Sequence, residues 1–250
     1  ALTQSQGNGM NDVIQLVQGT YRISENNNSR FMYESDEPYG IIIKGGYTSD
    51  CSSRVVNPSN TIIDGEGIYQ DGFENISPGG YPTSSVLTIL NWTLSPYTGI
   101  VIDGMTIKNG LSNYAGGLYA GAYYADIDIE HNIISNNSSN GYSEAGGLYV
   151  YSEEGILTVA DNIIKNNTGI YFAGVNAESN GNGNMVLTNN IVTGNVANNY
   201  GGGVSIGSYG GDLYLINNTI TGNTASGWFA GGLYLIPESG RIADIYNNII

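Results

Sequence analysis

From residue 101 onward the chain repeats one short pattern: an apolar strand, a polar pair, two apolar residues, and a polar cluster that contains Asn. The polar pairs are Asp103-Gly104, His131-Asn132, Asp161-Asn162, Asn189-Asn190, Asn217-Asn218 and Asn247-Asn248. The second residue of each pair recurs at intervals of 28, 30, 28, 28 and 30 residues. A Gly followed by an apolar residue recurs with nearly the same period, from Gly117-Leu118 to Gly232-Leu233. Two markers with one period indicate a repeat architecture.

Within each period the pattern is that of β-strands. In residues 148–151, Leu-Tyr-Val-Tyr, the aliphatic side chains share one face and the tyrosines the other, and the helical spacing i, i+3, i+4, i+7 is absent. A propeller blade needs about 40 residues, and a leucine-rich repeat needs a Leu-x-x-Leu-x-Leu frame that the chain lacks. The period fits one coil of a right-handed parallel β-helix. We therefore expect an all-β solenoid of eight to nine coils, with 28–30 residues in each.

The Asn of each polar pair is expected to have a structural role. Asn tolerates the left-handed backbone of a sharp corner, and stacked Asn side chains can hydrogen-bond along a ladder. The members of this predicted ladder are Asn132, Asn162, Asn190, Asn218 and Asn248. The lone histidine, His131, occupies the same corner and is interpreted as a turn residue. The recurrent Gly beside the next strand is expected to serve a tight corner as well.

Residues 1–100 are less regular than residues 101–250. Apolar runs at 13–17, 41–43 and 61–63 indicate earlier strands, and polar inserts at 24–30 and 69–82 indicate loops that leave the coil. No linker or change of pattern marks a second domain. We therefore expect residues 1–250 to form one β-helix domain, with irregular N-terminal coils and regular later ones.

Several segments resemble the bacterial pectate-lyase-like β-helix proteins. Residues 12–21, 41–47 and 60–65 are similar to their opening, and residues 217–223 resemble the later coils of the choice-of-anchor Q group. The resemblance implies a right-handed parallel β-helix that is secreted or displayed at a cell surface. Members usually begin with a capping helix, and residues 1–4 resemble only its last part. We therefore expect the chain to be a piece of a longer extracellular protein.

The composition narrows the choice of partners. The chain has 22 acidic and 7 basic residues, a net charge of −15, which argues against nucleic acid because phosphate contacts need clustered Lys and Arg. No apolar run approaches the ~18 residues of a spanning helix, so no membrane insertion is expected. The single cysteine, Cys51, excludes an internal disulfide. It is expected to be a buried thiol, as free Cys often is, or to pair outside this segment.

One acidic strand is the candidate metal site. A resemblance to pectate lyases implies carboxylates that hold Ca²⁺ beside an Arg or Lys base. Asp126, Asp128 and Glu130 share one face of a strand and could supply such oxygen ligands. The alternative is an ordinary solvated strand face, and Lys108 and Lys165 are expected on a different side. No residue is therefore assigned a catalytic role.

Aromatic residues form a candidate glycan-binding face. It comprises Tyr119, Tyr149, Tyr151, Tyr234 and Trp228, whose rings could stack on sugars. The alternative is that the tyrosines stack on each other between coils, because Tyr is common at outward strand positions.

Taken together, these patterns favour a non-catalytic extracellular or cell-surface β-helix with a structural, adhesive or glycan-binding role. The expected partners are polysaccharides, other surface proteins, or further copies that associate through open coil ends. The alternative is a Ca²⁺-dependent polysaccharide lyase, or another carbohydrate-active enzyme, that acts on acidic polysaccharide.

Overall fold

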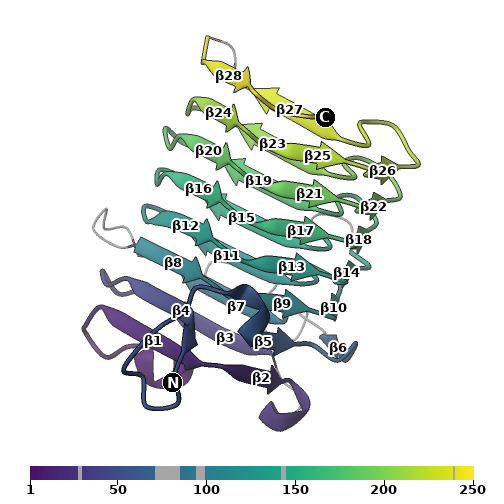
Figure 1. Cartoon of the computed structure of the whole chain (residues 1–250). Helices are drawn as coiled ribbons and strands as arrows, with labels where there is room; N and C mark the ends of the chain where they lie inside the picture. Colours follow the sequence, from purple (N-terminus) through teal and green to yellow (C-terminus); the bar gives the residue numbers. More distant parts are fainter. Residues whose placement is uncertain (28–29, 71–84, 94–98, 142–144, 239) are drawn as a thin grey trace.

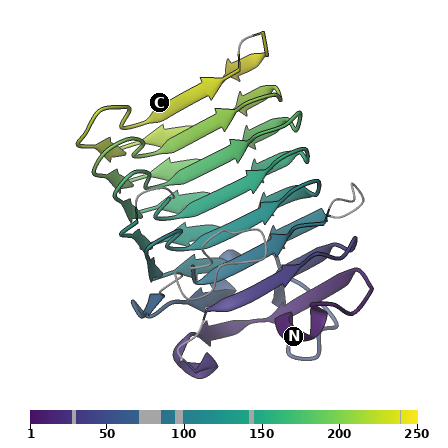
Figure 2. The same cartoon turned by 180° about the vertical axis from the view of Figure 1, so that it is seen from behind.

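The protein is a parallel β-solenoid of about 7 turns (Figure 1). The computed structural model describes residues 1–27, 30–70, 85–93, 99–141, 145–238 and 240–250. The two termini lie at opposite ends of the solenoid (Figures 1 and 2). The predicted all-β parallel β-helix is thus confirmed, with fewer turns than the eight to nine expected.

Four parallel sheets run along the solenoid, and a regular coil passes through them in the order A, B, D, C. Sheet A contains β1 (Asp12–Val17), β4 (Ile41–Tyr47), β8 (Gly99–Asp103), β12 (Asp126–Glu130), β16 (Leu157–Ala160), β20 (Met185–Thr188), β24 (Leu213–Ile216) and β28 (Ala243–Tyr246). Sheet B contains β2 (Gly19–Arg22), β5 (Thr61–Asp64), β9 (Thr106–Lys108), β13 (Ile133–Ser135), β17 (Ile163–Lys165), β21 (Ile191–Thr193) and β25 (Thr219–Thr221).

The other two sheets close each coil. Sheet D contains β6 (Tyr69–Gln70), β10 (Leu111–Ser112), β14 (Ser138–Ser139), β18 (Thr168–Gly169), β22 (Val196–Ala197) and β26 (Thr224–Ala225). Sheet C contains β3 (Phe31–Ser35), β7 (Leu87–Asn91), β11 (Leu118–Ala122), β15 (Leu148–Ser152), β19 (Val175–Ser179), β23 (Val204–Ser208) and β27 (Leu233–Pro237). Short helical segments are α1 (Leu2–Ser5) and the 3-10 turns η1 (Ser24–Asn26) and η2 (Pro58–Asn60).

The number of turns is lower than predicted because one early coil is long. Ile41 of β4 pairs with Ile100 of β8, 59 residues later, whereas Ile100 pairs with Ile127 only 27 residues further on. Part of the excess is the β4–β5 segment, residues 48–60, which folds across the first coils (Figure 1). Cys51 lies in this segment and is exposed, so the expectation of a buried thiol is wrong. Its left-handed φ of 57° places it in a surface turn.

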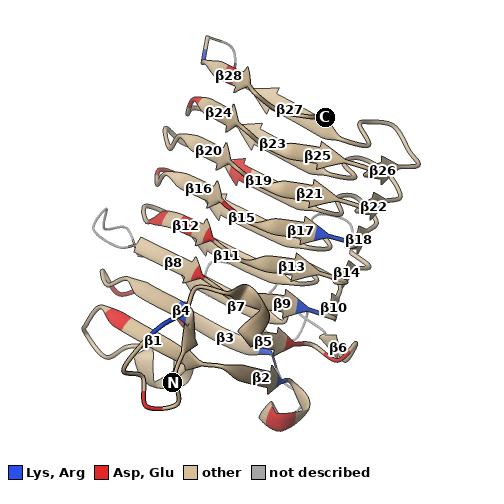
Figure 3. Ribbon diagram, in the orientation of Figure 1, with Lys and Arg blue, Asp and Glu red and all other residues tan. Residues whose placement is uncertain are grey.

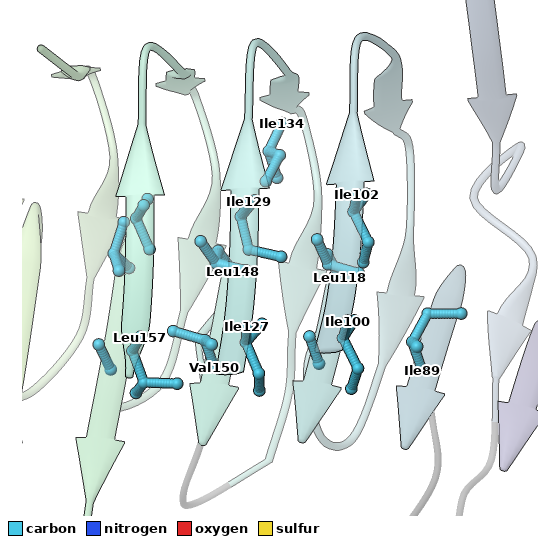
Figure 4. Close-up of a cluster of buried hydrophobic side chains, with 14 of the residues drawn as sticks. Ile89, Ile100, Ile102, Leu118, Ile127, Ile129, Ile134, Leu148, Val150 and Leu157 are labelled. Carbon is cyan, nitrogen blue, oxygen red and sulfur yellow. The ribbon is translucent and has the colours of Figure 1, made fainter. Parts of the chain in front are cut away.

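The core is built from inward side chains that stack coil upon coil. Ile102, Ile129, Val159 and Leu187 occupy one register column of sheet A, and each is at most 2% exposed. Figure 4 shows Leu118 and Leu148 of sheet C pointing toward this column from the opposite side. Alternation in the sequence selects these residues, because successive side chains of a strand face opposite ways. Full burial of such a side chain contributes about 1.5–3 kcal/mol.

The left-handed corners lie one residue before the predicted ladder positions. Between sheets A and B, positive φ values of 52–57° occur at the first residue of each pair: His131, Asp161, Asn189, Asn217 and Asn247. His131 is thus part of a turn. The second residue is buried at Asn132, Asn162, Asn190 and Asn218 and half-buried at Asn248, and it contributes its side chain rather than an unusual backbone.

Those buried Asn side chains form a continuous hydrogen-bonded ladder. The Oδ1 atoms of Asn162, Asn190, Asn218 and Asn248 accept the backbone N–H of the preceding ladder Asn at 2.8–3.1 Å. Each Nδ2 also donates to a strand carbonyl of the preceding coil, as from Asn190 to Val159 at 2.7 Å. Every rung therefore joins two coils, and the ladder Asn residues from Asn132 to Asn218 are at most 2% exposed.

A second ladder, which sequence reasoning missed, follows the first at an offset of five residues. It comprises Asn137, Asn167, Asn195 and Asn223, between sheets B and D. Their Oδ1 atoms accept the N–H of the previous rung at 3.0 Å, and Asn137, Asn167 and Asn195 are at most 1% exposed. The signal was present as a recurrent Asn five positions after each ladder Asn.

The recurrent Gly column is required by close packing and not by a tight corner. Gly117, Gly147, Gly174, Gly203 and Gly232 have no positive φ. A Cβ at Gly147 would lie 2.6 Å from Gly174 O and 2.8 Å from Nδ2 of Asn167. The column therefore leaves room for the second Asn ladder, and the expectation of corner glycines is wrong at these positions.

Candidate functional site

The three carboxylates proposed as Ca²⁺ ligands lie on the outer side of β12. Ile127 and Ile129 between them are fully buried, so Asp126, Asp128 and Glu130 all face outward. Asp126 Oδ1 accepts the N–H of Ile156 at 2.8 Å, which gives it a role in the turn of the next coil. In the described residues, no three His, Cys, Asp or Glu side chains are placed to hold a metal ion. The placement of the three carboxylates therefore adds no support to the predicted Ca²⁺ site, which stays a prediction.

A charged cluster surrounds the end of this strand. Asp103, the register partner of Glu130, pairs with Nη2 of Arg54 at 2.9 Å and with Nδ1 of His131 at 3.1 Å. Arg54 also donates from Nε to Gly45 O at 2.8 Å. Figure 3 shows acidic residues along β8 and β12. The guanidinium thus fixes the β4–β5 segment to β8. The basic residue in the same register column of sheet A as Asp103 and Glu130 is Lys44 of β4.

Glu130 has a displaced pKa, and its replacement has an expected effect on stability. Burial, followed by the charge of Asp128, raises the pKa of Glu130 above its ordinary value of 4.5. A raised pKa in the folded state means that the ionised carboxylate opposes folding, an effect relieved as the pH falls through that pKa. We expect Glu130→Gln to stabilise the protein at pH 7 by on the order of 0.5 kcal/mol, discounted for solvent screening.

The check is urea unfolding of both proteins at pH 7 and again well below pH 4.5, the ordinary pKa of this carboxyl. The difference should disappear at the lower pH, where Glu130 is protonated in both folded and unfolded chains. A Glu130→Gln protein that is less stable at pH 7 would show that the carboxylate has an attractive partner that outweighs Asp128.

The aromatic residues of the predicted glycan-binding face differ in solvent exposure. Tyr119, Tyr149 and Tyr151 point outward from sheet C, but they are 0%, 3% and 3% exposed. Tyr119 and Tyr149 pack with ring centroids 5.0 Å apart, in a cluster that includes Trp92 and Tyr114. These three tyrosines are therefore not accessible to a sugar, which corrects the expectation of an open face there.

The remaining predicted rings lie in later coils, where a second aromatic column occurs. Tyr171 and Tyr200 stack at 4.8 Å with 21° between their planes, and Tyr200 and Phe229 at 4.9 Å with 18°. Tyr234 packs on Phe229 at 4.7 Å, whereas Trp228 is 86% exposed. Stacked rings offer their edges outward and cover one another's faces. This column supports stacking between coils more than stacking on sugar, with Trp228 the exception.

A polar groove at the corner between sheets B and D was not predicted from the sequence. It is an open groove of about 510 Å³, and its lining residues are Arg22, Asp64, Glu66, Gly67, Asn109, Gly110, Leu111, Asn136 and Ser138. These residues come from β2, β5, β10, β14 and the corners beside these strands. The groove therefore spans neighbouring coils on one side of the solenoid.

The carboxylates of the groove are ionised and already partnered. Burial raises the pKa of Asp64, but hydrogen bonds from Glu66 N and Asn109, and the Lys108 ammonium at 3.2 Å, bring the pKa below its ordinary value. Hydrogen bonds from Ser24 lower the pKa of Glu66, and Arg22 Nε lies 4.0 Å from Glu66. Each charge in the groove thus faces an opposite one.

Comparison of the chain with family models, with curated proteins and with solved structures gave no match. The resemblance to pectate-lyase-like proteins is therefore supported at the level of the β-helix fold alone. No helix in the described ranges combines the length and apolar character needed to cross a bilayer.

Proposed function

We propose that the chain is a non-catalytic structural segment of an extracellular or cell-surface protein of the pectate-lyase-like β-helix type. Its role is to act as a stiff rod that holds an adhesive or sugar-binding surface away from the cell. Calcium-dependent cleavage of acidic polysaccharide is the competing function.

The observation that carries this proposal is the pair of buried Asn ladders. They add side-chain hydrogen bonds between coils to the backbone bonds of four parallel sheets. Each coil is stabilised mainly by its neighbours in such a solenoid. A chain that uses its buried polar side chains in this way resists local opening, which suits a mechanical element exposed to proteases outside the cell.

The location is tested with the exposed thiol of Cys51. Intact cells of the native source are treated with a membrane-impermeant maleimide, next to cells that carry Cys51→Ser. An extracellular chain should be labelled in intact cells, with the label lost in the Cys51→Ser cells. Labelling that appears only after lysis would contradict an extracellular location.

The absence of catalysis is tested separately, on the purified chain. Acidic and neutral polysaccharides are incubated with and without Ca²⁺, and unsaturated products and new reducing ends are measured. We expect no cleavage. Ca²⁺-dependent cleavage that is lost in Asp128→Ala would overturn the proposal in favour of a lyase.

A further inference from the structure

We propose that the groove between sheets B and D binds a neutral saccharide. The site comprises Arg22, Glu66, Asn109, Asn136 and Ser138, together with Gly67, Gly110 and Leu111. It is separate from both aromatic clusters and from the acidic strand β12. The inference rests on the proposed function and deepens it, because it gives a sugar-binding surface of the rod a location and a ligand class.

The shape of the groove suits a ring-sized ligand. About 510 Å³ lies within the range of small-molecule sites. Gly67 is exposed and a Cβ built there would meet no atom within 4 Å, so the groove is open to solvent on this side. Leu111 is half-buried and offers an apolar side chain between polar neighbours. A sugar ring has a matching character, with a C–H face bordered by hydroxyl groups.

The charges select a neutral ligand. Lys108 is neutralised by Asp64 at 3.2 Å, and Arg22 lies between Glu25 at 3.2 Å and Glu66 at 4.0 Å. An anionic ligand would have to compete with these carboxylates for each cation, and it would approach a protein of net charge −15. A cationic ligand would likewise have to displace Lys108 or Arg22. Uncharged hydroxyl groups face neither cost.

The side chains at the rim of the groove retain both hydrogen-bond donors and hydrogen-bond acceptors that a ligand could use. The exposed Asn136 side chain makes no hydrogen bond within the described part of the chain, and Asn109 uses only Nδ2, toward Asp64 at 2.8 Å. The hydroxyl of Ser138 accepts from Thr168 at 3.0 Å and keeps its own proton to donate. A hydroxyl group can donate to Asn109 Oδ1 and accept from the Asn136 amide, so a polyhydroxylated ligand can satisfy the whole rim.

Two substitutions test the site, each with a matched control. Ser138→Tyr fills the groove from β14, whereas Val196→Tyr places the same ring on the same outward column two coils away. Asn136→Gly removes the amide but keeps the left-handed corner, since Gly194 and Gly222 already occupy equivalent positions. Asn166→Gly makes the same change one coil further on, outside the lining of the groove.

The measurement is titration calorimetry of the folded proteins with cello-, xylo- and mannohexaose, and with a hexamer of galacturonate as the acidic counterpart. We expect at least one neutral hexaose to bind, with affinity at least tenfold weaker in Ser138→Tyr and in Asn136→Gly and unchanged in both controls. Binding of the galacturonate hexamer alone, no binding of any neutral hexaose, or neutral binding that survives both groove substitutions would overturn the proposal. These outcomes leave the rod unaffected, because it is tested by maleimide labelling and by the cleavage screen.

Discussion

Asn190→Ala should lower the free energy of unfolding by about 3–5 kcal/mol, the largest effect of a single substitution that we expect. Asn190 is 2% exposed and lies in the middle of the first ladder. Its Oδ1 accepts from the backbone N–H and the side-chain Nδ2 of Asn162, both at 3.1 Å. Its Nδ2 donates to Val159 O at 2.7 Å and to Asn218 Oδ1 at 3.0 Å.

The magnitude follows from the groups that lose their partners. Alanine leaves the Asn162 N–H and the Val159 carbonyl buried without Asn190, and each such group costs about 1–3 kcal/mol. The loss of the Asn162–Asn190–Asn218 connection also weakens contacts between three successive coils. Because neighbouring coils stabilise one another, the damage is expected to lower the cooperativity of unfolding as well.

The matched control is Asn189→Gly, one residue earlier. Asn189 is exposed and has a φ of 57° that Gly adopts freely. Guanidinium unfolding should place this control within about 0.5 kcal/mol of the parent protein. If Asn190→Ala unfolded at the same denaturant concentration as the control, the ladder would contribute nothing to stability.

Gly147→Ala should cost about 3 kcal/mol, at the upper end of the usual penalty for overpacking. The added methyl would lie 2.6 Å from Gly174 O, a backbone atom, and 2.8 Å from Nδ2 of Asn167. Asn167 is fully buried and is a rung of the second ladder. The methyl can therefore be accommodated only by shifting a β-strand of the next coil or by breaking a rung.

Gly207→Ala provides the comparison, because it also adds one methyl to a buried glycine, in this case within β23 of sheet C. Its nearest neighbour would be Cε2 of Tyr209 at 3.5 Å, an ordinary van der Waals contact. We expect a small change of either sign, because the lower entropy of the unfolded chain offsets any adjustment. Equal thermal stabilities of the two variants would contradict the close approach of the coils at Gly147.

The repetitive part of the fold was predictable because each coil repeats the same pattern of apolar and polar residues. Alternation of apolar residues selects the inward side chains such as Ile127 and Ile129, and the period follows from the recurrence of Asn132 and its equivalents. The left-handed residue was misplaced by one position. Both members of the pair are often Asn, so composition alone does not distinguish the corner from the buried rung. His131 and Asp161, which are not Asn, mark the corner in two coils.

Tertiary features were less predictable. Outward tyrosines such as Tyr149 are selected by the same alternation whether they end in solvent or under other aromatic rings, and only the packing of Trp92 and Tyr114 distinguishes the two. The groove was missed because Asp64 and Asn109 lie 45 residues apart, across the long coil that interrupts the period. A repeat analysis compares residues that are 28–30 positions apart in the sequence, so it does not bring such a pair together.

The central claim, that the ladders lock the coils into one cooperative rod, is tested most directly by hydrogen exchange of the backbone amides of Asn162, Asn190 and Asn218. Each of these N–H groups donates to the Oδ1 of the next rung. The account predicts that they exchange as slowly as the amides of the core strands β16 and β20, through global unfolding alone. Exchange at the rate of exposed turns, while those strands stay protected, would contradict it.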